Sequence, residues 1–149
     1  MQNLFHSGMS DAVIDRLSKL QPSSAALWGK MNIAQMLSHC QAPLQIAMGT
    51  ILIKLRFIGL LFGRITKSQL MKEGPFAKNL PTDKIFIRKS EHNFYQERER
   101  LRALIQQFAN ADSMVMASKV HPFFGKMTAD EWGCPTWKHL DHHLKQFGV

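Results

Sequence analysis

The fold is decided by the clearest helical stretch of the chain, which reads SEHNFYQERERLRALIQQFAN over residues 90–110. Its apolar residues recur at the spacing of a helix and fall on one face, while charged residues fill the opposite face. The residues of this apolar stripe are Phe94, Leu101, Ile105 and Phe108. Ser90 is a residue type that favours the N-cap position. The stretch is therefore predicted to be an amphipathic helix that begins at Ser90 and packs its stripe against a core.

Two stretches nearer the N-terminus show the same spacing. Residues 10–20 are predicted to form a helix with Ser10 as its N-cap. A second helix is predicted to begin at Asn32, because Asn32 and Gln35 have the spacing of a capping box. Pro43 is expected to kink or break this helix, since proline has no amide N–H to donate.

The last helix is predicted over about residues 136–147, directly after Pro135. Upstream of it, Thr128 and Glu131 form another capping-box pattern, which is expected to cover one short turn. The C-terminal region is therefore expected to be a structured connection followed by a helix.

The remaining sequence contains few strand signals. The run KEGPFAKNLPTD, residues 72–83, is predicted to be a loop because glycine and proline interrupt it. The only alternating run is KIFIRK, residues 84–89. Four amphipathic helices with long connections predict an all-α four-helix bundle. A chain of 149 residues is expected to form one domain, residues 1–149.

The most apolar segment is residues 46–65, but it is not predicted to span a membrane. Lys54 and Arg56 stand at its middle, and each central charge costs ~2.5–3.5 kcal/mol against ~0.3–0.6 kcal/mol gained per apolar residue. It is predicted to be a helix end followed by an apolar connection. This connection is expected to cover the core or to form a partner interface, for example in a homodimer. Contact with a membrane surface is the less favoured alternative.

The charge and the cysteines narrow the class of protein. The formal net charge is +8, but the basic residues are scattered and no nucleic-acid-binding signature is present, so no nucleic acid is expected as a partner. Cys40 and Cys134 lack a CxxC spacing, which fits a reducing compartment. The first residues do not read as a signal peptide, and a cytoplasmic location is expected.

Three histidines are concentrated near the C-terminus. His139 and His143 are four residues apart, which places them on one face of a helix, where two imidazoles can reach one metal ion. His142 is three residues from His139, so that pair is an alternative. A third ligand would come from a facing helix, and His39 is the candidate. Each of these residues, taken alone, is better explained by a polar surface or by a core histidine bonded to the backbone.

Other residues near this motif have less specific patterns. His121 precedes Pro122, so it is expected to be extended and to support the metal site or to orient its own loop. Asp141 lies roughly 160° from His143 around the helix and is expected to face solvent. Cys40 is expected to be a small core residue.

The segments MNIAQMLSHC, residues 31–40, and HPFFGKMTADEWGCPTWKHLDHHLKQFGV, residues 121–149, resemble the DinB/YfiT-like superfamily and, within it, a small subfamily of unknown function. The resemblance implies a four-helix bundle with an up-down-down-up arrangement and a divalent metal held by three histidines. The residues that match those ligands are His39, His139 and His143. His142 matches a neighbour that is not a ligand, and Gln146 matches the family's glutamine on the same face.

A three-histidine site would leave coordination positions open on Zn, Ni, Cu or Fe, and the sequence does not select among them. Relatives implied by the resemblance are transferases and isomerases that use a low-molecular-weight thiol. The predicted function is therefore a metal-dependent enzyme of the thiol-transferase type that activates a thiol or water, acting on a small molecule. The alternative is a non-catalytic protein in which the metal staples the bundle for binding or interaction. The sequence identifies no catalytic residue, thiol or substrate.

Overall fold

The computed structural model describes residues 1–51, 67–79 and 90–149. Their helices and strands are α1 (Met9–Ser18), α2 (Ile33–Met48), α4 (Phe94–Ala109), α5 (Ser113–Ser118), β1 (Val120–His121), β2 (Gly125–Lys126) and α6 (Ala129–Gln146). The two strands form one small antiparallel hairpin, in which Val120 faces Lys126. Residues 67–70 are also helical.

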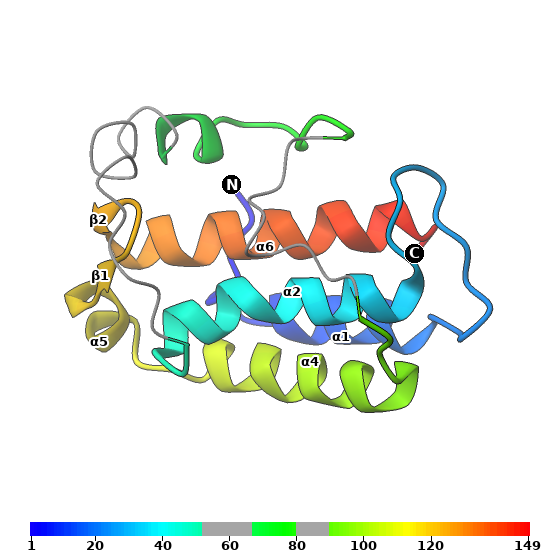
Figure 1. Cartoon of the computed structure of the whole chain (residues 1–149). Coiled ribbons are helices and arrows are strands. Elements are labelled where there is room, and N and C mark those ends of the chain that lie inside the picture. Colours follow the sequence, from blue (N-terminus) through cyan, green and yellow to red (C-terminus); the bar gives the residue numbers. More distant parts are fainter. Residues whose placement is uncertain (52–66, 80–89) are drawn as a thin grey trace.

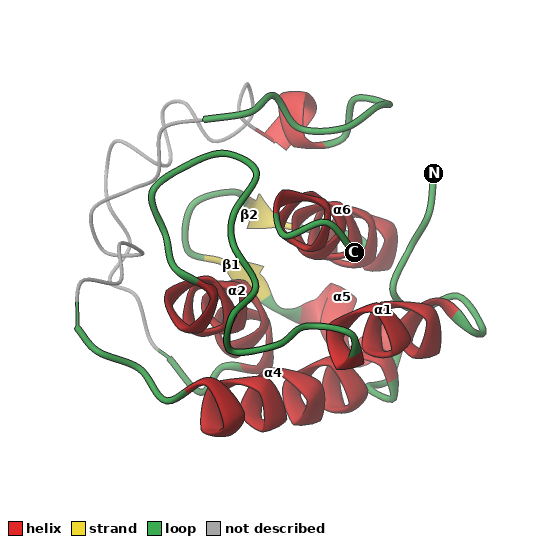
Figure 2. Ribbon diagram, turned by 90° about the vertical axis from the view of Figure 1, so that its right-hand side faces the viewer, coloured by secondary structure: helices red, strands yellow, loops and turns green. Residues whose placement is uncertain are grey.

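The four long helices α1, α2, α4 and α6 form a bundle. The colours of Figure 1 show that α1 and α6 run in one direction and that α2 and α4 run in the other, which is an up-down-down-up arrangement. Viewed along the helices in Figure 2, α2 and α1 each lie between α4 and α6, and these are the pairs that make contact. The predicted all-α four-helix bundle is confirmed.

The parallel neighbours α2 and α4 explain the long connection between them. A chain that leaves α2 at one end of the bundle must return to the other end before α4 can begin, and 45 residues separate the two helices in the sequence. Residues 72–79 of the predicted loop contain no helix or strand. Most of the apolar segment 46–65 and the run 84–89 lie outside the described residues. Among the described residues, no helix is both long and apolar enough to cross a membrane.

The core is made by the apolar stripes that the sequence predicts. Leu101, Ile105 and Phe108 of α4 are almost completely buried, and Leu37 and Leu44 of α2 meet them. Burying one such side chain contributes about 1.5–3 kcal/mol, so the stripes hold the helices together.

Two predicted helix starts are wrong by a few residues. Helix α4 begins at Phe94 rather than at Ser90, because the side chain of Asn93 accepts a hydrogen bond from the Gln96 amide and caps the helix there. Helix α1 begins at Met9, so Ser10 lies inside the helix, and Gly8 at the cap makes no side-chain hydrogen bond.

Both capping boxes are present, but Pro43 does not break α2, and Pro135 does not mark the start of the last helix. The Asn32 and Gln35 box begins α2, which continues through Pro43 to Met48. The Thr128 and Glu131 box begins α6 itself. This helix is 18 residues long and continues through Pro135. A proline in a helix removes one backbone hydrogen bond, and tertiary packing around both helices outweighs that loss.

Gly133 of α6 is where the N-terminal segment crosses this helix. The Leu4 amide donates to the Gly133 carbonyl at 3.3 Å. A Cβ atom at Gly133 would lie 1.9 Å from the Asn3 side-chain oxygen, so only glycine permits this approach. The crossing therefore ties the N-terminal segment to the first half of α6.

Asp141 does not face solvent, contrary to the prediction. Its side chain is 8% exposed and accepts hydrogen bonds from Arg16 of α1 and from Lys145, each at 2.8 Å. The prediction used only the angle from His143, but α1 packs against this other face of α6. Asp141 therefore joins α1 to α6.

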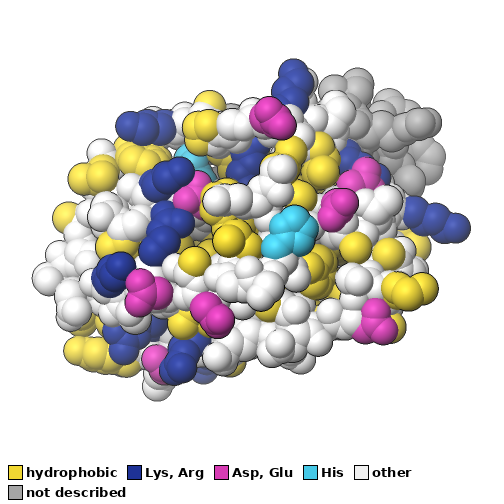
Figure 3. Space-filling model, turned by 180° about the vertical axis from the view of Figure 1, so that it is seen from behind, with side chains coloured by type: hydrophobic (Ala, Val, Ile, Leu, Met, Phe, Trp, Pro, Cys, Tyr) yellow, Lys and Arg dark blue, Asp and Glu magenta, His cyan; other side chains and the backbone are white. Residues whose placement is uncertain are grey.

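The surface opposite the view of Figure 1 mixes both signs of charge. Figure 3 shows Lys and Arg side chains spread over this face with Asp and Glu side chains between them. The positive charge of the chain is therefore not gathered into one basic patch on this face.

Substituting Asp141 is expected to destabilise the bundle. Asp141→Ala leaves Arg16 without its carboxylate, and we expect the free energy of unfolding to fall by about 2–3 kcal/mol, since hydrogen bonds to charged groups contribute ~1.5–3 kcal/mol. Urea unfolding measures this change. The control is Asp15→Ala, which removes an exposed ion pair with Lys19 and should change stability by less than about 0.5 kcal/mol. Equal losses in the two variants would contradict this role of Asp141.

Candidate metal centre

Three histidines meet across the interface of α2 and α6. His39 lies on α2, and His139 and His143 lie one turn apart on the facing side of α6. Each offers a ring nitrogen, and these three nitrogens all lie within 4.8 Å of one another. Nε2 of His39 lies 3.1 Å from Nε2 of His139. The structure therefore brings together the three residues that the sequence analysis singled out as metal ligands.

The spacing of one pair of these nitrogens fits a shared ion. Two nitrogens that each lie ~2.0–2.1 Å from one tetrahedral zinc ion are ~3.3 Å apart. The observed 3.1 Å between His39 and His139 agrees with that spacing. Three imidazoles from two rigid helices, with their nitrogens converging, form a donor set that suits Zn, Ni, Cu or Fe.

Burial keeps the rings of His139 and His143 neutral. Burial lowers the pKa of His139 well below its usual value, and the nearby His143 and His39 lower it further. Burial also lowers the pKa of His143 to about 3, with a second contribution from His39. A neutral imidazole has a free lone pair, which is the form that binds a metal.

Gln146 orients one of these rings. The Nδ1–H of His143 donates to Oε1 of Gln146 at 2.8 Å, which leaves Nε2 of His143 as the ligand atom. Gln146 in turn donates from Nε2 to the Trp28 carbonyl at 2.6 Å. A hydrogen bond of this kind fixes both the tautomer and the angle of a ligand histidine.

The loop before α2 requires glycine at position 29, where it passes close to the Gln146 side chain. Gly29 has φ +84°, and a Cβ atom there would lie 2.5 Å from Nε2 of Gln146. The Leu27 amide also donates to the Gln146 backbone carbonyl at 2.8 Å. The loop is therefore fastened to the end of α6 beside the histidine cluster. The sequence analysis missed Trp28 and Gly29, although a glycine just before a helix cap was an available turn signal.

His142 lies outside the cluster and is half-buried. Its ring packs edge-on near the rings of Trp28 and Phe76, with ring centres 5.8 and 6.0 Å apart. It is not part of the three-nitrogen group. The structure therefore pairs His139 with His143 and not with His142.

His121 is extended, as predicted, and occupies β1 at one end of α6. Its Nδ1 accepts hydrogen bonds from the backbone amides of Phe123 and Phe124. It lines a cavity of about 190 Å³ that it shares with His139. It is not part of the three-nitrogen cluster.

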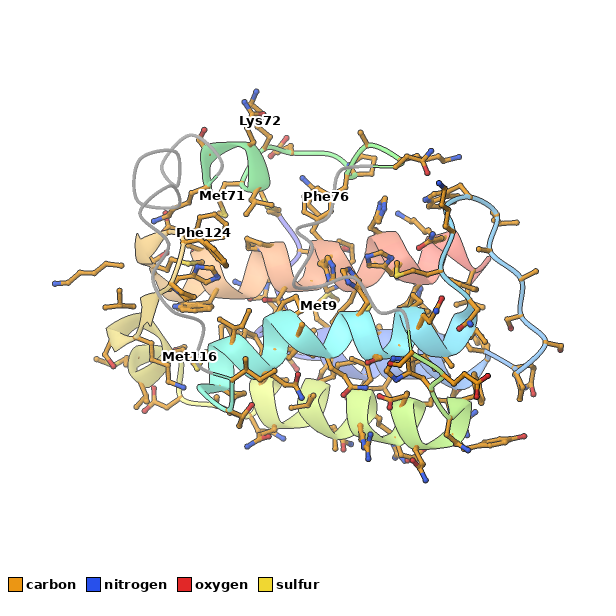
Figure 4. The ribbon with its side chains drawn as sticks, viewed as in Figure 1. Met9, Met71, Lys72, Phe76, Met116 and Phe124 are labelled. Carbon is orange, nitrogen blue, oxygen red and sulfur yellow. The ribbon has the colours of Figure 1, made fainter. Side chains whose placement is uncertain are left out.

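This cavity extends along α6 from the hairpin to the cluster. Its walls include Phe76, His121, Phe124, Trp132, Thr136 and His139. Figure 4 shows Phe124 beside the N-terminal half of α6 and Phe76 over its middle. The cavity therefore reaches the cluster at His139.

The two cysteines are free and buried. Burial raises the pKa of the Cys40 thiol far above its usual value, and its Sγ contacts Sδ of Met36 at 3.6 Å. Burial, and then the charge of Asp130, raise the pKa of Cys134. Neither thiol is activated as a nucleophile, and the packing role predicted for Cys40 agrees with this environment.

Fold and site together define a helical-bundle protein with a three-histidine cluster between two of its helices. Over residues 2–148 the chain matches the family described as "Protein of unknown function (DUF1569)", and it belongs to that family. Comparison with curated proteins and with solved structures gave no match.

The pKa of His121 should lie far below that of an ordinary histidine. Burial and the nearby charge of Lys67 lower its pKa from 6.5 to about 4. Between these two values the unfolded chain binds a proton that the folded chain does not. The free energy of unfolding therefore falls as the pH drops through this range, by up to about 1.4 kcal/mol per pH unit. An NMR titration should give a midpoint near 4, with the proton on Nε2 at neutral pH, and Lys67→Met should raise that midpoint. A midpoint of 6.5 would contradict this environment.

Proposed function

We propose that this protein binds one divalent metal ion through His39, His139 and His143. The observation that carries the proposal is the convergence of their three ring nitrogens within 4.8 Å across the α2–α6 interface. The hydrogen bond from His143 to Gln146 supports it, because such bonds orient ligand histidines in metal sites.

We also propose membership of the DinB/YfiT-like superfamily. The up-down-down-up order of the bundle supports this relationship, as does the last-helix pattern in which His139, His142, His143 and Gln146 follow the family's spacing. The same relationship supports a single domain over residues 1–149.

The activity that this site supports best is that of a metal-dependent enzyme of the thiol-transferase type, or a related hydrolase or isomerase. A divalent ion at a three-histidine site retains open positions and lowers the pKa of a thiol or water that binds it. The chain itself supplies neutral ligands, and its half-buried His139 lines a cavity large enough for a small organic molecule. That cavity is the specific observation that favours catalysis.

A non-catalytic role is the second candidate. His39 and His143 are buried and belong to different helices, so an ion bound there would also cross-link α2 to α6. The segment RFIGLLF, residues 56–62, was expected to decide between the two roles by covering the site or leaving it open. It lies outside the described residues.

The cellular compartment, the partner and the assembly state are proposed on more general grounds. Two free, buried cysteines fit a reducing, cytoplasmic compartment. We further propose that the partner of the site is a small molecule rather than nucleic acid or a membrane, and that a homodimer is the candidate assembly.

Removing any one ligand should abolish metal binding. Protein purified without an affinity tag is expected to bind about one equivalent of zinc, as measured by elemental analysis after dialysis. His39→Ala, His139→Ala and His143→Ala should lose it, because two imidazoles do not retain the ion. Gln146→Leu should weaken the affinity about 10–100-fold, which is the usual loss when the partner of a ligand histidine is removed. His142→Ala is the matched control and should retain the metal. Equal loss of metal in all four histidine variants would show that His139 and His143 are not the ligand pair.

A thiol-transfer activity should depend on the cluster and not on the protein's own cysteine. With glutathione, bacillithiol or mycothiol and 1-chloro-2,4-dinitrobenzene, the thiol sulfur bonds to the ring carbon and chloride and a proton leave. We expect the zinc-loaded protein to accelerate this conjugation in an absorbance assay. His39→Ala should abolish the acceleration, and Cys40→Ser should retain most of it, because the Cys40 thiol is buried and its pKa is raised. Activity that required Cys40 would exclude the thiol-cofactor reaction.

A further inference from the structure

One segment of the long connection between α2 and α4 lies over α6. This segment, residues 72–79, is the strap, and it contains no helix or strand. Phe76 is its one residue that is not exposed to solvent. A segment with so little buried surface opens more easily than the packed helices beneath it.

The Phe76 side chain is also the part of the strap that borders the metal centre. It lines the cavity of about 190 Å³ together with His139. Its ring packs edge-on near His142, with ring centres 6.0 Å apart. Figure 4 shows Phe76 over the middle of α6, whereas Lys72 points away from the bundle. The one anchored side chain of the strap is therefore a wall of the cavity that reaches the three histidines.

Lys138 of α6 holds the strap in this position. Its side chain is buried, and its Nζ donates to the Lys72 carbonyl at 2.9 Å. The same Nζ lies 4.5 Å from the centre of the Phe76 ring. At the far end of the strap, Nζ of Lys78 lies 4.4 Å from the centre of the Trp28 ring. One hydrogen bond and two cation–π contacts are weak compared with the packing of a core helix, so these contacts are reversible.

The backbone on each side of Phe76 is suited to a hinge. Gly74 has φ +91° and Asn79 has φ +59°. Glycine adopts this left-handed conformation without strain, and asparagine is among the few other residues that visit it routinely. Hinges are formed by a few loop residues of this kind that absorb a change of backbone angle. A change at Gly74 and Asn79 would move Phe76 away from α6 and leave the helices in place.

We propose that the strap is a gate over the metal centre, in which Phe76 is the closing side chain and Lys138 is the residue that positions it. In the closed position the Phe76 ring covers the His139 end of the cavity. When the strap moves at Gly74 and Asn79, an ion or a small molecule reaches the histidines. The role as a gate for metal and substrate rests on the proposed function, whereas the covering of His139 by Phe76 does not.

The first test measures access to His139 in the metal-stripped protein. Diethyl pyrocarbonate acylates neutral imidazole nitrogens, and tandem mass spectrometry reports the rate at each histidine. In Phe76→Ala the rate at His139 should rise about five- to tenfold, because the closing ring and its packing are lost. The rate at the exposed His6 should stay the same. Tyr95→Ala, which removes an exposed ring of α4, is the matched control and should leave both rates unchanged.

Variants of Lys138 test its positioning role in the same assay. Lys138→Met keeps most of the apolar stem but loses the hydrogen bond to Lys72 and the cation over Phe76, so the rate at His139 should rise. Lys138→Arg retains a cation and should restore a rate near that of the wild type. A rise of the same size in both variants would show that Lys138 does not act through its charge.

The second test follows zinc uptake and release by stopped flow, with a pyridylazoresorcinol indicator. Phe76 offers no ligand atom, so Phe76→Ala should raise both rates by a similar factor and leave the Kd unchanged. The proposal is overturned if His139 is acylated at the wild-type rate in Phe76→Ala. It is also overturned if the Kd changes while the uptake rate does not, which is the result expected of a wall with a structural role alone. Absence of zinc binding by the wild type would refute the proposed function, and the acylation rates would still decide whether Phe76 covers His139.

Discussion

The interaction on which the rest of the structure depends is the packing of α2 against α6, which forces three imidazoles into one buried space. Charging His139 or His143 there is unfavourable, since burial and the neighbouring rings lower the pKa of both. Neutral rings with converging lone pairs are held together most favourably by a cation. The cluster therefore favours the binding of a metal ion. Without a metal, it leaves three polar side chains inside the interface between α2 and α6.

The surrounding structure holds α6 in the register that this cluster needs. Gln146 ties the His143 ring to the loop at Trp28, and Gly29 leaves room for that contact. On the other face, Arg16 of α1 bonds to Asp141 and also donates to the Val149 carbonyl. The up-down-down-up order makes α2 and α6 neighbours although about a hundred residues separate their ligands. The same helix also carries Trp132 to the hairpin, so one rigid element joins the cluster to the cavity that adjoins it.

Local sequence signals were enough for the four long helices, though not for their starts, and for the histidine pair of α6. Asn32 and Thr128 each show their capping box directly, and the four-residue spacing of His139 and His143 fixes a common helix face. Selecting His39 also required the resemblance to a family, since one histidine on an apolar helix has a simpler explanation. What the sequence could not supply depends on tertiary contacts. Asp141 was misplaced because the burial of its face comes from α1. Pro135 was misread as a boundary because a proline alone does not end a helix that tertiary packing stabilises. Nothing local indicates that the Trp132 indole N–H lacks a partner among the described residues.

The central claim is that three imidazoles, and no thiolate, bind the ion. X-ray absorption at the zinc edge tests it most directly, on untagged protein loaded with one equivalent of zinc. Cys40 follows His39 directly in the chain, so a sulfur ligand is the sharpest alternative. The account predicts a first shell of nitrogen or oxygen at ~2.0–2.1 Å with the outer-shell scattering of about three imidazoles. Sulfur at ~2.3 Å, or a first shell without the imidazole pattern, would contradict it.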